Sequence, residues 1–249
     1  VDMKIGFIGT GNMAGAIMSG LINKGIFQPD EIIGSDISGQ GRQNAKDNYS
    51  ICVTEDNREA ASAEVLVLSV KPQFYADTIA EIRDSMTEKQ LVITIAPGKT
   101  LKWLGEQFGK EMKIIRTMPN TPAMVGEGMT AACPNEFVTD EELGYALKIL
   151  GAFGKVEIVP ERIMDAVVAV SGSSPAYVFM LIEAMADAAV MEGMPRTQAY
   201  KFAAQAVYGS AKMVLETGKH PGELKDMVCS PAGTTIGAVR ILEEKGFRS

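Results

Sequence analysis

The chain has little of the side-chain chemistry that most metal and hydrolytic sites require. Its 249 residues include one histidine, His220, and three cysteines, Cys52, Cys133 and Cys229. The cysteines are odd in number and form no Cys-x-x-Cys pair, so we expect no metal site. A single histidine gives no Ser-His-Asp set, and no lysine follows the glycine-rich turn as in a Walker loop. We interpret Cys229 as a packed thiol.

Positive charge and long apolar runs are also scarce. The chain has 24 Lys and Arg against 31 Asp and Glu, a net charge of −7. This balance argues against nucleic acid or an anionic membrane as a partner. Polar residues break every apolar stretch before 18 residues, so we expect no transmembrane helix. With so few cysteines and no leader peptide, we expect a cytoplasmic protein.

The N-terminus carries a glycine-rich turn between a strand and a helix. Residues 4–8 (KIGFI) predict a short strand, and the turn after it, residues 9–14 (GTGNMA), has the pattern G-x-G-x-x-A. Apolar residues every four positions then predict a helix that stops at Gly25. A second strand, ending in Asp36, completes the pattern of a dinucleotide site with the pyrophosphate at the helix N-terminus. The alternative is a tight turn that binds no ligand.

Strands and helices alternate up to about Pro160, and helices alone follow it. Apolar or β-branched runs predict further strands at residues 65–70, 91–95, 113–117 and 155–159. Helical spacing occurs at residues 74–83 and 100–108, and Thr139 begins a capping box. We therefore predict an α/β fold, with a doubly wound Rossmann-type domain over residues 1–160 and an all-helical domain over residues 161–249.

One predicted helix of the second domain is apolar on most of its circumference. It covers residues 176–190 (AYVFMLIEAMADAAV). Such a helix must be covered on nearly every side, and fewer than ninety residues of helix cannot do this alone. We expect these helices to pack on a second copy of the chain, giving at least a dimer. The alternative is a helical layer lying wholly on the α/β domain.

The segment 220–246 predicts a short helix, a polar loop and a second helix that opens at Thr234 or Thr235. A helix N-terminus offers unpaired N–H groups and a partial positive charge, which suit a carboxylate. Gly233 lets the backbone approach a ligand, and Ser230 adds a hydroxyl. The segment predicts a pocket for a small anion, with an ordinary capped helix as the alternative.

Loops after the predicted strands bring further candidates to the cofactor edge of the sheet. Lys71 either faces the nicotinamide or ribose of the cofactor or is a solvated lysine. Ala96 and Pro97 offer backbone groups beside the cofactor. Asn120 lies between two prolines and is either held towards the site or part of a rigid turn. The serines of residues 171–175 (SGSSP) are explained as a helix N-cap.

Hydride transfer suits this inventory, because the cofactor carries the chemistry and the protein supplies orientation. Reducing a ketone usually needs a Lys, His or Tyr proton donor. The helices between Arg162 and Glu192 contain neither Lys nor His. A cyclic imine is different, since its protonated nitrogen already draws hydride to carbon. It needs a carboxylate cradle and one hydroxyl at the ring nitrogen, which residues 220–246 offer.

Almost from end to end, the sequence resembles the pyrroline-5-carboxylate reductases, which complete proline synthesis. The resemblance rests on residues 7–13 (FIGTGNM), 69–72 (SVKP), 116–122 (RTMPNTP), 165–167 with 171–177 (DAV, SGSSPAY), and 220–226 with 230–235 (HPGELKD, SPAGTT). It implies a reduced nicotinamide cofactor on the first domain, and helical domains intertwined as a homodimer or built into a larger homo-oligomer. The substrate would lie between one subunit's cofactor and a partner's C-terminal helices.

The resemblance also implies roles for single residues. The backbone around Ser230, Gly233 and Thr234 would hold the substrate carboxylate. Thr235, the catalytic residue, would hydrogen-bond the ring nitrogen, and Glu161 would border the substrate. Cofactor contacts are implied at Gly9, Thr10, Gly11, Asn12, Met13, Ser35, Asn57, Val70, Lys71, Ala96 and Pro97.

Two departures from the family pattern stand out. Ala232 replaces the first glycine of a loop that usually reads Pro-Gly-Gly, and members of the family continue past Ser249. The sequence also leaves the choice between NAD and NADP open. Asp36 favours the free ribose hydroxyls of NAD, whereas Ser35 with Arg42 would suit the 2′-phosphate of NADP. Because the family more often prefers NADPH, we expect NADP(H) to be preferred, with NAD(H) as the alternative.

Two other functions fit parts of the pattern. A β-hydroxyacid or prephenate-type dehydrogenase shares the layout but would need a Lys or His on the central helices. A nucleotide sensor would keep the fold without turnover. Oxidation of NADPH by pyrroline-5-carboxylate distinguishes the three.

Overall fold

The structure is a computed structural model that describes residues 3–249. The chain divides into two compact units, one extending to Ala176 and the other comprising Tyr177–Ser249. Each unit is described by itself.

The first unit is built on an eight-stranded sheet with the order β3-β2-β1-β4-β5-β6-β7-β8. The strands are β1 (Ile5–Ile8), β2 (Ile32–Ser35), β3 (Cys52–Thr54), β4 (Val65–Leu68), β5 (Leu91–Thr94), β6 (Lys113–Met118), β7 (Gly128–Pro134) and β8 (Gly154–Ile158). Neighbouring strands run parallel except β6 and β7. The central strands β1, β2, β4 and β5 are buried throughout, as expected for strands covered on both faces.

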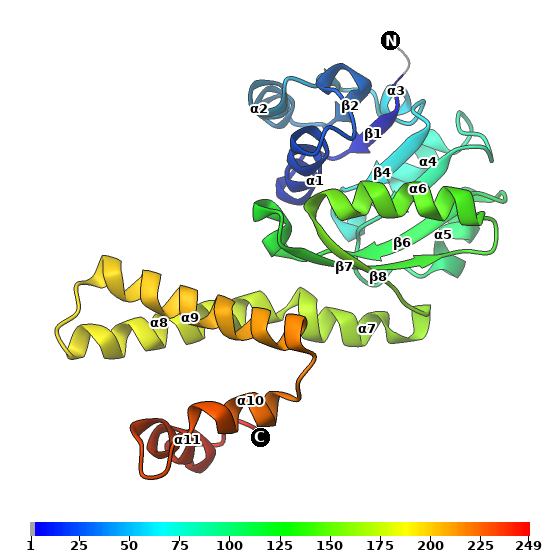
Figure 1. Cartoon of the computed structure of the whole chain (residues 1–249). Coiled ribbons are helices and arrows are strands. Elements are labelled where there is room, and N and C mark those ends of the chain that lie inside the picture. Colours follow the sequence, from blue (N-terminus) through cyan, green and yellow to red (C-terminus); the bar gives the residue numbers. More distant parts are fainter. Residues whose placement is uncertain (1–2) are drawn as a thin grey trace. The chain divides into compact units, whose positions relative to one another are not determined.

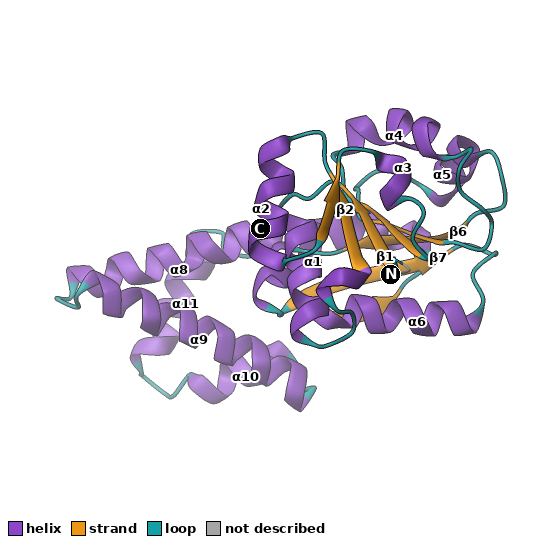
Figure 2. Cartoon of the chain, turned by 90° about the horizontal axis from the view of Figure 1, so that it is seen from above, coloured by secondary structure: helices purple, strands orange, loops and turns teal. Residues whose placement is uncertain are grey.

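Helices cover both faces of this sheet (Figure 2). They include α1 (Asn12–Asn23), α2 (Gly39–Tyr49), α3 (Asn57–Ala60), α4 (Tyr75–Ile82), α5 (Leu101–Phe108) and α6 (Asp140–Leu150); a short helix, α7 (Met164–Val167), follows the sheet. One hydrophobic core joins the sheet to α1 and α6, with Leu21 and Phe153 fully buried. A second core joins the opposite face to α3, α4 and α5, around Tyr75 and Phe108.

The predicted fold class is confirmed, and the structure adds two strands that the sequence did not indicate. β3 is three residues long and half-buried at the edge of the sheet, too short for a recognisable pattern. β7 consists largely of Gly, Thr and Ala, which carry a weak strand signal. It pairs antiparallel to β6, and β8 then pairs parallel to β7 at the end of the sheet.

The second unit is helical. Its elements are α8 (Ser174–Met191), whose first turn belongs to the first unit, α9 (Arg196–Thr217), α10 (Pro221–Val228) and α11 (Thr234–Glu244) (Figure 1). The predicted helices of this region are all present. A π-helical turn, η6 (Val168–Gly172), precedes α8. Residues Glu161–Met191 form a helical run that is long and apolar enough, by length and composition, to cross a membrane.

Candidate active site

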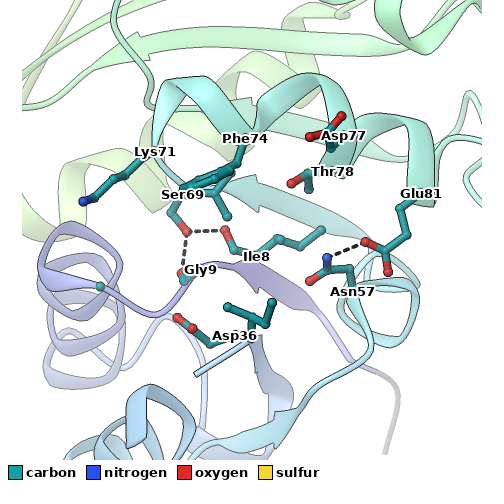
Figure 3. Close-up of a pocket in the computed structure, with 13 residues that line it drawn as sticks. Ile8, Gly9, Asp36, Asn57, Ser69, Lys71, Phe74, Asp77, Thr78 and Glu81 are labelled. Atoms are coloured by element: carbon teal, nitrogen blue, oxygen red, sulfur yellow. Dashed lines mark hydrogen bonds between the residues drawn. The ribbon is translucent and has the colours of Figure 1, made fainter. Parts of the chain in front are cut away.

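A cavity of about 540 Å³ opens at the carboxyl ends of β1, β2 and β4. This is the edge at which doubly wound folds bind their ligands. Gly9 follows β1, Asp36 follows β2, and Ser69 follows β4, so three separate strand ends meet at the cavity (Figure 3).

The glycine-rich turn leaves the start of α1 open to a ligand. Gly9 has φ +94°, and a Cβ there would lie 2.9 Å from backbone atoms of Ser69 and Val70. Gly11 is the N-cap of α1 and provides no side-chain cap, and the first turn holds no acidic residue. The unpaired N–H groups and the helix dipole therefore favour an anion at this point. The turn fits the pyrophosphate of a dinucleotide.

Two serine hydroxyls fix the strand ends around the turn. The Ser69 hydroxyl donates to the carbonyl oxygens of Ile8, at 3.0 Å, and Gly9, at 2.7 Å. Ser35 is fully buried, and its hydroxyl donates to Oδ1 of Asn57 at 2.8 Å. The Asn57 amide in turn donates to Glu81 at 2.7 Å. Ser35, which does not line the cavity itself, thus holds Asn57 in the cavity wall.

The structure places the predicted cofactor residues in two groups. The cavity lining includes Gly9, Gly11, Asn57, Val70 and Lys71. The remaining predicted residues lie outside that lining: Thr10, Asn12, Met13, Ser35, Ala96 and Pro97. Their contacts with a cofactor stay predictions.

Four lining residues that the sequence interpretation did not single out come from one short stretch. Phe74 ends η2 (Pro72–Phe74), and Asp77, Thr78 and Glu81 lie on α4. They form the wall opposite Asp36 (Figure 3). The available signal was their position directly after β4, because the loop and helix after each parallel strand border this edge of the sheet.

The Asn120 side chain, in the loop after β6, links two other backbone segments. Its side-chain oxygen accepts from Met129 N at 2.8 Å, and its amide nitrogen donates to the Ser171 carbonyl oxygen at 3.0 Å. Both polar atoms of the side chain are therefore engaged with backbone. The rigid-turn interpretation of this loop fits these bonds, which also anchor the π-helical turn η6 to the sheet.

Glu161 lies in η5 (Glu161–Ile163) and forms an ion pair with Arg116 of β6 at 2.8 Å. The same carboxylate oxygen accepts from Leu101 N, at the first residue of α5, at 2.7 Å. Arg116 is almost fully buried, whereas the Glu161 side chain is 32% exposed. The contacts of Glu161 thus join β6, α5 and η5. Its position beside the substrate stays a prediction.

The turn before α11 presents an uncapped helix N-terminus. Gly233 is the N-cap, no side chain caps the helix, and the first turn holds no acidic residue. A Cβ at Gly233 would lie 2.4 Å from the Ser230 hydroxyl oxygen and 3.2 Å from the Ser230 carbonyl oxygen, so Ser230 would have to move to admit a side chain there. Ala232 takes the left-handed φ of +58°, which explains why the family pattern has glycine at this position. The expected alternative, an ordinary capped helix, does not describe this end of α11.

His220 caps a different helix. Its Nδ1 accepts from Gly222 N at 3.0 Å and so begins α10. The chain's single imidazole therefore has a local structural role.

Comparisons with known proteins cover both parts of the chain. Residues 161–249 match the family described as "Pyrroline-5-carboxylate reductase dimerisation", and residues 4–98 match "NADP oxidoreductase coenzyme F420-dependent". The long apolar run that includes α8 thus lies within a dimerisation domain.

Full-length relatives agree. The chain is 54% identical to pyrroline-5-carboxylate reductase of Escherichia coli, over 100% of this chain and 93% of the relative. The Coxiella burnetii enzyme has a TM-score of 0.88 at 37% identity, over 100% of this chain and 93% of that one. The Plasmodium falciparum pyrroline carboxylate reductase, a structure with NADP bound, has a TM-score of 0.90 at 31% identity, over 99% and 91%. The chain belongs to the pyrroline-5-carboxylate reductase family, oxidoreductases that reduce 1-pyrroline-5-carboxylate to L-proline.

Proposed function

We propose that the glycine-rich cavity of the first unit binds the nicotinamide cofactor and that the turn at residues 230–235 binds the imino acid. The observation that carries this proposal is that α1 and α11 both begin at a glycine N-cap, with no side-chain cap and no acidic residue in the first turn. One suits a pyrophosphate and the other a small carboxylate. When bound, the reduced nicotinamide supplies a hydride, that is, two electrons and one proton.

The substrate's own charges set the roles of the turn. The backbone around Ser230, Gly233 and Thr234 holds the carboxylate, and the Thr235 hydroxyl accepts a hydrogen bond from the protonated ring nitrogen. The C=N carbon takes the hydride and the C=N bond becomes a single bond. The π electrons of the C=N bond become a lone pair on the nitrogen, which keeps its proton and loses its positive charge. The secondary amine then takes a second proton from solvent. No dedicated side-chain acid is needed for this step.

The resemblance favours NADP(H) as the preferred reductant and leaves NAD(H) as the alternative. We further propose a cytoplasmic homodimer or larger homo-oligomer that binds neither nucleic acid nor membrane. In this assembly the turn at residues 230–235 meets the cofactor of the partner subunit. The dimerisation domain and the net charge of −7 support these proposals.

The test is a reductase assay with the purified chain, 1-pyrroline-5-carboxylate and each reduced nicotinamide in turn. We expect loss of nicotinamide absorbance matched mole for mole by L-proline, measured by chromatography. Omitting the imine and replacing it by a keto acid are the controls. Cofactor binding without consumption, or consumption with the keto acid alone, would contradict the proposal.

A further inference from the structure

Asp36 is held in a fixed position in the lining of the proposed cofactor cavity. Its Oδ2 accepts from both the backbone nitrogen and the hydroxyl of Thr10, each at 2.9 Å. Its Oδ1 accepts from Ser38 N at 2.9 Å. An ionised carboxylate offers about four acceptor positions, so about one is left for a further donor. A ribose hydroxyl is such a donor, whereas a phosphate is not.

The charges around the cavity are predominantly negative. The lining holds the carboxylates Asp36, Asp77 and Glu81 and one cation, Lys71, a balance of −2. Lys71 follows β4, and Figure 3 shows it away from the wall formed by Asp77 and Glu81. A phosphate monoester adds about −1.5 to −2 charges at neutral pH. The 2′-phosphate of NADPH would therefore bring a dianion to a wall that already repels it.

Arg42 is the nearby cation that would suit a 2′-phosphate, but it is engaged elsewhere. Its Nη1 donates to the carbonyl oxygens of Asp36, at 2.7 Å, and Ile37, at 3.3 Å. Its Nη2 pairs with Glu55 at 3.4 Å, and its side chain is 23% exposed. The guanidinium stabilises the backbone after β2 and is not part of the cavity lining.

We propose that Asp36 makes this chain select NADH over NADPH, an inference that rests on the proposed function. The carboxylate accepts a hydrogen bond from the adenosine 2′-hydroxyl and repels a 2′-phosphate. Thr10 fixes the carboxylate, so the glycine-rich turn that receives the pyrophosphate also sets the choice of cofactor. This reverses the preference expected from the family resemblance.

The first test uses the unmodified protein. With saturating 1-pyrroline-5-carboxylate, we expect kcat/KM for NADH to exceed that for NADPH by about tenfold or more. Dissociation constants for NADH and NADPH, measured without imine by protein fluorescence quenching, should show the same order. A higher kcat/KM with NADPH, or tighter NADPH binding, would overturn the proposal.

The second test changes the carboxylate. Asp36→Asn keeps an oxygen that accepts from Thr10 but removes the charge, so the ratio of the two kcat/KM values should shift towards NADPH by about tenfold. Asp84→Asn removes the same charge from a side chain that is 94% exposed, and should leave the ratio within twofold. An Asp36→Asn ratio within twofold of the parent would overturn the role of Asp36. If that variant fails to fold, the unmodified protein decides the preference.

The two proposals fail in different ways. Tighter binding of NADH with no turnover of either cofactor would contradict the reductase site and support the selectivity. Proline formation that is faster with NADPH would support the reductase site and refute the selectivity.

Discussion

The two units of the chain differ in how they cover their apolar side chains. The α/β unit buries Phe7, Tyr75, Phe108 and Phe153 almost completely. In the helical unit, the buried residues are the alanines Ala186, Ala199 and Ala203. Large side chains of that unit are exposed, among them Tyr177, Phe179, Met180, Phe202, Tyr208 and Leu215. The first unit carries its own core, whereas the second presents half of a core and needs another surface to complete it.

The comparison with known proteins supplies the physical reason. Residues 161–249 match a dimerisation domain, which supports the proposal that a second copy provides the missing surface. An isolated single chain should therefore be stable in its first unit and incomplete in its second.

Disrupting the apolar face of α8 should have the largest effect. Phe179 is 60% exposed in the single chain, and Phe179→Asp would bury a charge in the interface. We expect sedimentation velocity to show a shift towards monomer and activity to fall by about a thousandfold, because a buried unpaired charge is costly and aromatic anchors carry much of an interface's energy. Ile26→Asp, in the α/β unit at 37% exposure, is the control and should keep the parent's mass. A Phe179→Asp protein that stays dimeric and active would refute the half-core interpretation.

Removing a large side chain from the complete core should cost stability instead. Phe153 is fully buried, and Phe153→Ala should lower the free energy of unfolding by about 3–5 kcal/mol in urea denaturation. Phe74→Ala removes the same atoms from a side chain that is 52% exposed and should cost less than about 1 kcal/mol. Equal losses would show that burial in this unit does not determine stability.

Thr235→Ala tests the turn of the helical unit. Losing a hydrogen bond from a charged nitrogen should cost about 1.5–3 kcal/mol of transition-state binding, a fall in kcat/KM of about 10- to 150-fold. Thr235→Ser retains the hydroxyl and should recover most of the activity. The role of the hydroxyl would be disproved by an alanine variant within twofold of the parent.

Glu161→Gln distinguishes a stabilising ion pair within the first unit from a substrate contact. The almost fully buried Arg116 would lose its charged partner, and since Glu161 is 32% exposed we expect a stability loss of about 1–3 kcal/mol. If Glu161 also borders the substrate, KM for the imine should rise as well. The exposed Glu157→Gln, on neighbouring β8, is the control for both measurements. An unchanged free energy of unfolding would mean that the ion pair does not stabilise the first unit.

The smallest effect is expected at Glu142, in the capping box of α6. Burial opposes its ionisation, but hydrogen bonds from Lys113 and Thr139 outweigh burial and lower the pKa of this carboxyl. A lowered folded-state pKa stabilises the protein above the unfolded-state pKa of about 4.3, and this contribution disappears as the pH falls through the folded value. Glu142→Gln should therefore cost about 0.2–1 kcal/mol at pH 7, a difference that vanishes in acid. A difference that persists at pH 3 would contradict this origin.

Much of the fold could be predicted because its signals are local. The turn at residues 9–14, the apolar strand runs and the Thr139 capping box each depend on neighbours in the chain. β7 could not be predicted, because its small residues form a strand only by pairing with β6 and β8. The partners of Asn120 and Glu161 were equally hidden, since their bonds to Ser171 and Arg116 join residues about 50 positions apart.

The sequence alone determined the class of the fold, the glycine-rich turn and the helical second half, and it predicts a pocket for a small anion at residues 230–235. These follow from the periodicity of apolar residues and from the few residue types that a tight turn or helix start accepts. The tertiary structure decided which side chains meet. It placed Asp36 against Thr10, turned the Arg42 guanidinium onto backbone carbonyl oxygens, and brought Asp77 and Glu81 to the cavity beside the glycine-rich turn. Such contacts depend on packing distant segments together, and no local pattern encodes them.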